Sequence, residues 1–394
     1  MAWETKRIKD VVKVNELTLS ESTDQNYEFK YIDIGSINLF KIAETETTTF
    51  LDAPSRARRI VRKNDVLVST VRTYLKAITY IDFEPKDMIA STGFAVMTPQ
   101  KKINPKFLSY AVESDYFIDD VIKNSVGTSY PAINALKLEA LSIILPTLEI
   151  QRKIAAFLDS KTQNIDRRIE LLQKKKERYI ILRKAIINEV VNGDEKDWMP
   201  CRLKDLVFNL VESGKRPVEI EEDVVSIGGE HIQNEKFYLE NLKYVSFSTF
   251  KKSKGKIEIG DILVVKDGAT IGKCMYVSDM PFEKMLLNEH VYRIQSNKKC
   301  NNKFLFYFIL SNGDFWFRLN NMTTAQETIK LDTIYTMKIN LPNIKEQDKI
   351  ANYLDKKTSA IDTIVEKITK EIDALKIYRR ALINETVTGK LNIG

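Results

Sequence analysis

The chain has 394 residues, 43% of them hydrophobic and 29% charged, and a formal net charge of +7. These values are typical of a globular protein of two to three domains, and the absence of any apolar run near ~20 residues excludes a membrane-spanning helix. The three cysteines are isolated, only two histidines occur and no secretory signal is recognisable, so we expect no disulfides, no metal site, no cofactor and a cytoplasmic location.

Residues 1–145 are predicted to form the first of two α+β domains. Short β-rich runs occupy 66–68 and 77–81, a turn signal covers 33–35, and a helical pattern runs from 105 to 120. Strand and helix signals mixed in this way are typical of a domain built on a twisted sheet.

Residues 146–194 are predicted to form a long helix. From Leu158 onwards apolar residues recur at steps of four and three, with charged residues elsewhere and no interrupting glycine or proline. This is the heptad pattern of a coiled-coil seam, and the seam residues assigned here are Leu158, Ile165, Ile169 and Leu172. Gly193 stands where a glycine commonly caps the end of a helix.

Residues 195–341 are predicted to form a second α+β domain. A β-rich run covers 262–265, a helical pattern runs from 302 to 317, and turn signals cover 254–256, 267–268 and 311–314. Residues 342–394 then form a second long helix with a capping glycine at Gly389. Its seam residues are Leu354, Ile361, Val365 and Ile368.

The chain is a tandem duplication. Leu145-Pro146, Gln151 and Arg183 return 196 positions later as Leu341-Pro342, Gln347 and Arg379, whereas the residues between such anchors differ almost completely. Because the two helices carry equal apolar stripes, we expect an antiparallel coiled coil of ~60 Å that separates the two similar domains with pseudo-two-fold symmetry. The alternative is that each helix packs only on its own domain.

A family resemblance rests on motifs in both halves. They are Gly127-Thr128, Leu138, Ile144-Leu145-Pro146, Glu149, Gln151 and Ile154, the later Leu341-Pro342, Glu346-Gln347 and Ile350-Ala351, and the openings Trp3 with Lys9-Asp10 and Trp198 with Lys204-Asp205. With its duplicated layout, the chain resembles over essentially its whole length the DNA-specificity subunit of type I restriction-modification systems. Ile150 and Thr323-Thr324 depart from the family pattern without disturbing the layout.

The resemblance implies a fold and a role. Each mixed domain would be a target-recognition domain that reads one half of a bipartite sequence in double-stranded DNA. The helices would set the unread gap and dock two methyltransferase (modification) subunits, and restriction subunits with motor and nuclease activity would join them. ATP and S-adenosylmethionine would belong to those partners.

Candidate DNA contacts in the first domain fall in three groups. A basic patch suited to phosphates, for which a solvated charged face is the alternative, comprises Arg56, Arg58, Arg59 and Arg62. The loop after 66–68 offers Arg72, which can fork onto O6 and N7 of guanine, beside Thr70, Thr73, Tyr74 and Lys76. A polar loop before the helix holds Thr128, Ser129 and Tyr130.

The second domain has corresponding candidates. Lys252 and Lys254 suit phosphates, and the loop after 262–265 offers Lys266, Thr270 and Lys273. The loop before the second helix holds Asn320, Asn321, Thr324 and Gln326. His231 and His290 are interpreted as polar surface or core residues, although His290 stands near Asn288 and could face DNA.

No catalytic motif is recognisable. Neither standard nucleotide-binding glycine loop occurs, and Asn104-Pro105-Lys106-Phe107 lacks the second proline of the amino-methyltransferase motif and is interpreted as a helix start. We therefore predict a non-catalytic recognition subunit rather than a self-contained nuclease or methyltransferase. A coiled-coil scaffold joining two protein-binding domains stays open, because a net charge of +7 favours a polyanionic partner only weakly.

Overall fold

The structure, a computed structural model, describes residues 3–38, 41–43, 45–193, 197–212, 224–321 and 328–393, without the side chains of Asn38, Glu212 and 318–321. The chain divides into two compact units. Unit 1 comprises Met1–Gln173 and Thr369–Gly394, and unit 2 comprises Lys174–Ile368. Each unit therefore holds one mixed domain, the beginning of the long helix that follows it, and the end of the other long helix.

Unit 1 contains two four-stranded sheets, with strand orders β6-β3-β10-β7 and β2-β11-β8-β9, and the separate pairs β1-β12 and β4-β5. Strands β3 and β10 run parallel, and the other pairs are antiparallel. The strands are β1 (Glu4–Arg7), β2 (Val12–Val14), β3 (Glu28–Ile32), β4 (Ile37–Asn38), β5 (Lys41–Ile42), β6 (Thr47–Thr49), β7 (Ala57–Ile60), β8 (Val66–Ser69), β9 (Ile78–Tyr80), β10 (Met88–Ser91), β11 (Phe94–Pro99) and β12 (Ser142–Leu145).

The core of unit 1 joins its two sheets. Ile32 and Ala90 of the first sheet share a buried cluster with Leu67 and Phe94 of the second. Strand β8 is buried along its whole length, which explains its uninterrupted Val-Leu-Val run. The helices of the domain are α1 (Pro105–Glu113), which packs on β8 and β9, α2 (Asp115–Lys123) and α3 (Ala135–Ala140), with short 3-10 turns η1 (Ile8–Asp10), η2 (Ile34–Ser36) and η3 (Thr73–Leu75).

Unit 2 repeats this plan with sheets β14-β22-β19-β20 and β18-β15-β21, and with the pairs β13-β23 and β16-β17. The buried core between its two sheets includes Ile227, Leu263 and Leu287. The strands are β13 (Met199–Arg202), β14 (Val207–Glu212), β15 (Val224–Ile227), β16 (Ile232–Gln233), β17 (Lys236–Phe237), β18 (Lys243–Val245), β19 (Ile262–Val265), β20 (Cys274–Tyr276), β21 (Met285–Leu287), β22 (Val291–Ser296) and β23 (Lys338–Leu341). Its helices are α5 (Phe247–Lys252), α6 (Asn302–Asn321) and α7 (Leu331–Tyr335), with η4 (Leu203–Asp205) and η5 (Gly229–His231).

Two helices of 44 residues each, α4 (Leu148–Val191) and α8 (Ile344–Val387), follow the two domains. The side chain of Asn343 caps α8 by accepting a hydrogen bond from the Glu346 amide at 3.0 Å. Gly389 ends α8 in the predicted left-handed conformation, with φ of 75°. None of the helices in the described ranges has the length and apolarity to cross a lipid bilayer.

Gly193 follows the end of α4 as predicted, but its backbone lies outside the left-handed region. The Trp198 ring stands 3.5 Å from the position that its Cβ would take, so an indole covers this helix end. At the other helix, the Trp3 ring lies 3.0 Å from the corresponding Cβ position of Gly389. Both glycines therefore face a tryptophan from the opening of a mixed domain, and only one of them needs a positive φ.

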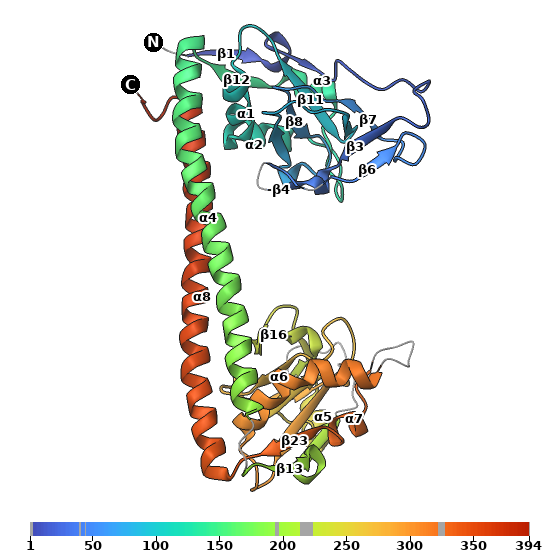
Figure 1. The fold of residues 1–394 in the computed structure, drawn as a ribbon, viewed down its shortest axis with the longest axis vertical. Helices are drawn as coiled ribbons and strands as arrows, with labels where there is room; N and C mark the ends of the chain where they lie inside the picture. The colour runs from blue at the N-terminus through green and yellow to red at the C-terminus, as the bar shows by residue number, and fades with distance from the viewer. Residues whose placement is uncertain are drawn as a thin grey trace. The chain divides into compact units, whose positions relative to one another are not determined.

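Within each unit, α4 and α8 lie side by side and run antiparallel, which confirms the expected pairing (Figure 1). The assigned seam follows the burial pattern: Leu172 and Val365 are half-buried, and Leu158, Ile165, Ile169, Leu354, Ile361 and Ile368 are buried. Leu354 also belongs to the core cluster of its own domain. The first heptad thus serves the domain as well as the helix pair.

The turn predicted at 311–314 was wrong, because these residues lie inside α6. Phe304 and Phe317 are buried in one core cluster, and Gly313 leaves room for the Phe317 ring, 3.0 Å from its virtual Cβ. Packing therefore keeps the helix continuous. In unit 1 the predicted helical patch is instead split, since Ser114 accepts a hydrogen bond from the Phe117 amide and starts a second helix.

Candidate nucleic-acid interface

A buried glutamine fixes each mixed domain to the start of its long helix. Gln151 accepts a hydrogen bond from the Asn104 amide at 2.8 Å and donates one to the Pro146 carbonyl at 2.8 Å. Gln347 makes the same two bonds in unit 2, at 2.8 and 2.8 Å. Because both amides are buried with their partners satisfied, they hold one orientation of domain and helix.

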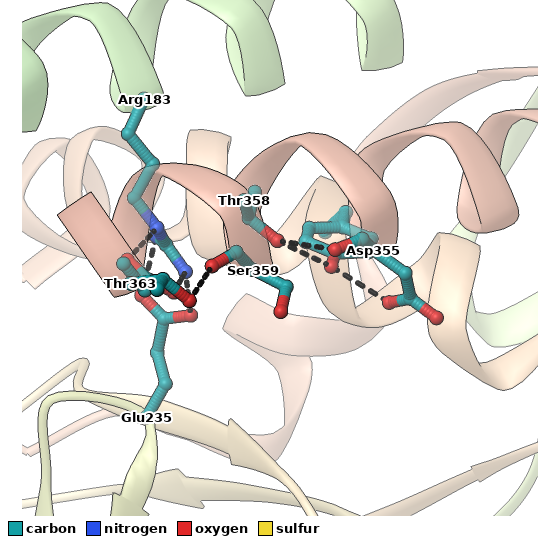
Figure 2. A network of polar contacts seen from close by, with 8 residues as sticks. Arg183, Glu235, Asp355, Thr358, Ser359 and Thr363 are labelled. Atoms are coloured by element: carbon teal, nitrogen blue, oxygen red, sulfur yellow. Dashed lines mark hydrogen bonds and ion pairs between the residues drawn. The ribbon is translucent and has the colours of Figure 1, made fainter.

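A tyrosine forms a second repeated attachment. Tyr110 donates to Asp159 at 2.6 Å, and Tyr307 donates to Asp355 at 2.8 Å. Figure 2 shows the unit 2 network around Asp355 and Thr358. Burial, reinforced by the neighbouring carboxylate, raises the pKa of both phenols. Both therefore stay protonated as hydrogen-bond donors at physiological pH.

An arginine ties the two helices together in each unit. Arg379 of α8 places Nε 2.9 Å from the Asp166 carboxylate of α4. Arg183 of α4 places Nε 2.9 Å from the Asp362 carboxylate of α8. The four residues obey the duplication, so the same ion pair occurs once in each unit.

The second carboxylate on each arginine comes from a different part of the two domains. In unit 1 it is Glu113 of α1, 3.1 Å from Arg379, and burial raises its pKa to about 7 despite the guanidinium. In unit 2 it is Glu235 in the β16–β17 turn, which binds both terminal nitrogens of Arg183 at 2.8 and 2.7 Å (Figure 2). The ion pair between the two helices is therefore the same in both units, whereas each domain contacts the arginine through a different element.

Three loops converge at the end of β8 in unit 1. The Thr70 amide donates to the Gly93 carbonyl at 2.8 Å, and the Thr70 carbonyl accepts from the Ile133 amide at 2.8 Å. In unit 2, Lys266 makes the same two bonds to His290 at 2.9 Å and Ile329 at 2.7 Å. The same backbone hydrogen bonds therefore join three loops in each unit. They are the loop after β8 or β19, the loop between β10 and β11 or between β21 and β22, and the loop that precedes the long helix.

On this frame, unit 1 presents a cation–π pair made from two of the loops predicted to contact DNA. The Arg72 guanidinium lies over the Tyr130 ring, with its carbon 4.8 Å from the ring centroid. Arg72 is exposed, as are Tyr130 at 65% and Tyr74 at 53%. A planar guanidinium with five donors, steadied by a ring, suits bidentate recognition of two acceptors.

The backbone at Arg72 is left-handed, with φ of 50°, and its counterpart 196 positions later is Gly268, with φ of 82°. Lys76, with φ of 52°, likewise corresponds to Gly272, with φ of 80°. A left-handed conformation costs a residue with a Cβ about 1 kcal/mol or more, and glycine adopts it freely. Unit 1 thus keeps two strained basic residues where unit 2 has glycines.

Unit 2 presents a different group on the same frame. The His290 Nδ1 lies 2.6 Å from the Asp267 Oδ1, and 47% of the histidine side chain is exposed. The counterpart of His290 in unit 1 is Gly93, whose virtual Cβ lies 3.3 Å from the Val71 side chain. The sequence suggested that His290 could face DNA, but its pairing with Asp267 was not predicted.

The four arginines of the basic patch predicted in unit 1 differ in exposure and in their contacts. Arg56 is exposed, and Arg59 is half-buried on β7. Arg58 lies 4.6 Å from the Phe50 ring centroid, and Arg62 donates to Glu16 at 2.7 Å. Arg62 therefore has a structural partner, and Arg56 is the most exposed member of the patch.

The other unit 1 candidates lie around the converging loops. Thr70 and Thr73 are buried, and the Thr73 hydroxyl lies 3.1 Å from that of Ser125. Lys76 lies 4.0 Å from Asp115. Thr128 and Ser129 are exposed in the loop that carries Tyr130.

The unit 2 candidates lie on three segments. Lys252, Lys254 and Lys273 are exposed, and Lys266 lies over the Tyr292 ring at 5.6 Å. Thr270 donates to the Gly229 carbonyl at 3.2 Å. The side chains of Asn320 and Asn321, and the whole of Thr324 and Gln326, lie outside the described residues.

Neither histidine is placed as a metal ligand. His231 is buried, and its Nδ1 accepts a hydrogen bond from the Gly228 amide at 2.9 Å, so it closes the η5 turn. Over the ranges that the structure describes, no group of three or more His, Cys, Asp and Glu side chains is arranged to hold a metal ion.

Comparison with known proteins identifies similar chains. The sequence model of the family described as "Type I restriction modification DNA specificity domain" matches residues 2–178 and again 195–374. The putative type I restriction enzyme MjaX specificity subunit of Methanocaldococcus jannaschii is 24% identical, over 99% of this chain and 94% of that protein. The type I restriction enzyme EcoKI specificity subunit of Escherichia coli is 19% identical, over 75% of this chain and 68% of that protein.

Solved structures share the fold. A chain from work on complex assembly and conformational transition of the type I R-M system has a TM-score of 0.78 and 22% identity, covering 99% of this chain and 98% of that one. The HsdS subunit from Thermoanaerobacter tengcongensis has a TM-score of 0.52 and 20% identity, covering 99% and 97%.

Proposed function

The chain belongs to the type I restriction modification DNA specificity family and carries two copies of its domain, and from that premise we propose that each unit reads one half of a bipartite DNA sequence. The converging loops at the ends of β8 and β19 make the base contacts. The chain itself is non-catalytic, and it works in the cytoplasm with partners that supply methyl transfer and cleavage.

The observation that carries this proposal is the exchange of side chains on a shared frame. Unit 1 offers the donor-rich Arg72 where unit 2 has Gly268, and unit 2 offers His290 where unit 1 has Gly93. The backbone ties that hold these positions are the same in both units. Base contacts specify sequence whereas phosphate contacts position the protein, so different groups at matched positions imply two different half-sites.

The helices carry matched apolar positions suited to two copies of one partner. Ile181 and Leu182 of α4 are 66% and 46% exposed, and their counterparts Ile377 and Tyr378 of α8 are 67% and 55% exposed. Exposed apolar patches that repeat with the duplication favour the same partner surface twice. We assign these positions to two methyltransferase subunits, with restriction subunits joining that core.

Methylated-base sequencing of cells that express the chain with a methyltransferase partner tests the function. We expect one asymmetric motif in two parts with a fixed unread gap, which disappears when the chain is omitted. A continuous motif, or no motif that depends on the chain, would contradict two-part recognition.

A further inference from the structure

The pair formed by Asp267 and His290 is set up on the recognition frame of unit 2. Asp267 follows Lys266 in the loop after β19 and forms a backbone bridge with Thr328. The His290 amide donates to the Asn288 side chain at 2.8 Å, and the His290 carbonyl accepts from the Lys266 amide at 2.9 Å. Both members of the pair are therefore fixed by backbone contacts, although they are 23 residues apart.

The geometry leaves one carboxylate oxygen for an external donor. Oδ1 of Asp267 lies 2.6 Å from the His290 Nδ1, which fixes the direction of the carboxylate. Within the described residues, Oδ2 of Asp267 has no hydrogen-bond partner. The Asp267 side chain is 24% exposed, so the carboxylate is held at the surface and is not extended into solvent.

Two neighbouring charged side chains contact groups other than this oxygen. Glu289 lies 3.6 Å from the other ring nitrogen of His290, and Lys266 lies over the Tyr292 ring. A carboxylate repels phosphates, so its place beside the recognition loops is not explained by general affinity for DNA. Its chemistry instead matches a base that presents a donor.

We propose that the Asp267 carboxylate, positioned by His290, reads the exocyclic amino group of a cytosine or an adenine in the half-site of unit 2. This inference rests on the proposed function. In the major groove, cytosine N4 and adenine N6 are the amino donors, and acidic side chains accept from such groups. Arg72 in unit 1 is the converse, a donor group suited to the acceptors of guanine.

The test uses the full-length chain. Binding selection from random duplexes first defines the motif. Each adenine and each cytosine of the motif is then replaced in turn by an analogue that lacks the exocyclic amine, purine for adenine and 2-pyrimidinone for cytosine. At one position of the second half-site, we expect removal of the amine to lower the affinity of the chain for the duplex by about tenfold or more. The base whose replacement has this effect is the one that Asp267 contacts.

Asp267→Ala is the main variant, and Asp279→Ala, at the opposite end of the β19–β20 hairpin, is the charge-matched control. We expect Asp267→Ala, which removes both acceptor oxygens, to abolish discrimination at the sensitive position and to leave the first half-site unchanged. It should bind non-cognate duplexes as tightly as the wild type or more tightly, because a negative charge is removed. His290→Asn should weaken the discrimination while leaving binding to phosphates intact.

The outcomes separate the two proposals. If the wild-type chain selects no sequence, the proposed function fails. If a motif appears but no amine in its second half matters, or if Asp267→Ala retains full discrimination, the role of Asp267 is wrong. Thermal unfolding of both aspartate variants shows whether a loss of discrimination reflects loss of the fold.

Discussion

At the scale of single residues, the duplication supplies an internal reference for strain. Asn64, Arg72 and Lys76 adopt left-handed backbone conformations in unit 1, and the counterparts at all three positions in unit 2 are glycines with positive φ. The fold therefore requires this backbone in both units. A strained residue that is kept where glycine would fit marks a position with another role, and at Arg72 that role is an exposed cation over an aromatic ring.

Arg72→Gly should separate stability from recognition. Relief of the left-handed strain, partly offset by the greater freedom of glycine in the unfolded chain, leaves the free energy of unfolding unchanged or raises it by up to about 1 kcal/mol. Loss of the guanidinium weakens specific DNA binding by about 1–3 kcal/mol and relaxes the first half-site only. Denaturant unfolding and DNA titration measure the two effects.

The matched control is Asn64→Gly, which changes a left-handed residue at the other end of β8. It removes one hydrogen bond from the Tyr80 hydroxyl, made at 2.7 Å, and should leave DNA affinity unchanged. Equal losses of affinity in the two variants would mean that a glycine anywhere around β8 disturbs the domain, and Arg72 would have no special role.

At the scale of elements, the attachment of α1 to the helix pair depends on a buried carboxyl group. Burial raises the pKa of Glu113 from its ordinary 4.5 to about 7, although Arg379 and its charge oppose the shift. The folded protein therefore holds a proton that the unfolded chain releases. The stabilising contribution is complete below about pH 4.5 and is lost as the pH rises through about 7.

Glu113→Gln should remove this pH dependence. Between about pH 5 and pH 8 we expect the wild type to lose about 2–3 kcal/mol of stability relative to the variant. Thermal or denaturant unfolding across this range measures the difference, with the exposed Glu84→Gln as control. Parallel pH profiles for the wild type and Glu113→Gln would show that Glu113 is already ionised throughout.

The long helices could be predicted from the sequence because their heptad pattern extends over many residues. Turns and helix ends were harder to predict. The heptads from Leu158 and Leu354 gave the helices and their antiparallel pairing, because many residues carry the same period. The turn predicted at 311–314 was wrong, since it rested on a few residues and the neighbouring aromatic side chains keep α6 continuous.

The candidate site was predictable as loops and less so as side chains. The loop after each central strand and Tyr130 were named from the sequence, and the structure brings Arg72 and Tyr130 together. The pairing of Asp267 with His290 was missed because it joins segments that only the sheet brings close. One signal was present: Gly268 aligns with Arg72, so unit 2 has no guanidinium at that position.

At the scale of the whole molecule, the net charge of +7 predicts that DNA affinity depends on salt concentration. A chain that binds several phosphates should lose about a thousandfold or more in affinity between about 50 and 200 mM salt, whereas a protein-binding scaffold shows no such slope. Arg56→Ala should reduce the slope of log affinity against log salt by about one and leave the motif unchanged. A slope near zero for the wild type would favour the scaffold.

The left-handed positions also bear on how such a protein changes over generations. Glycine and arginine codons differ by a single base, and a Cβ at Gly268 would meet open space. A point mutation can therefore install or remove a guanidinium on a backbone that already has the required φ, at a cost of about 1 kcal/mol and with no rebuilding of the sheet. Descendants of one gene can drift in sequence preference by such steps while every buried glutamine, tyrosine and arginine of the shared frame stays in place.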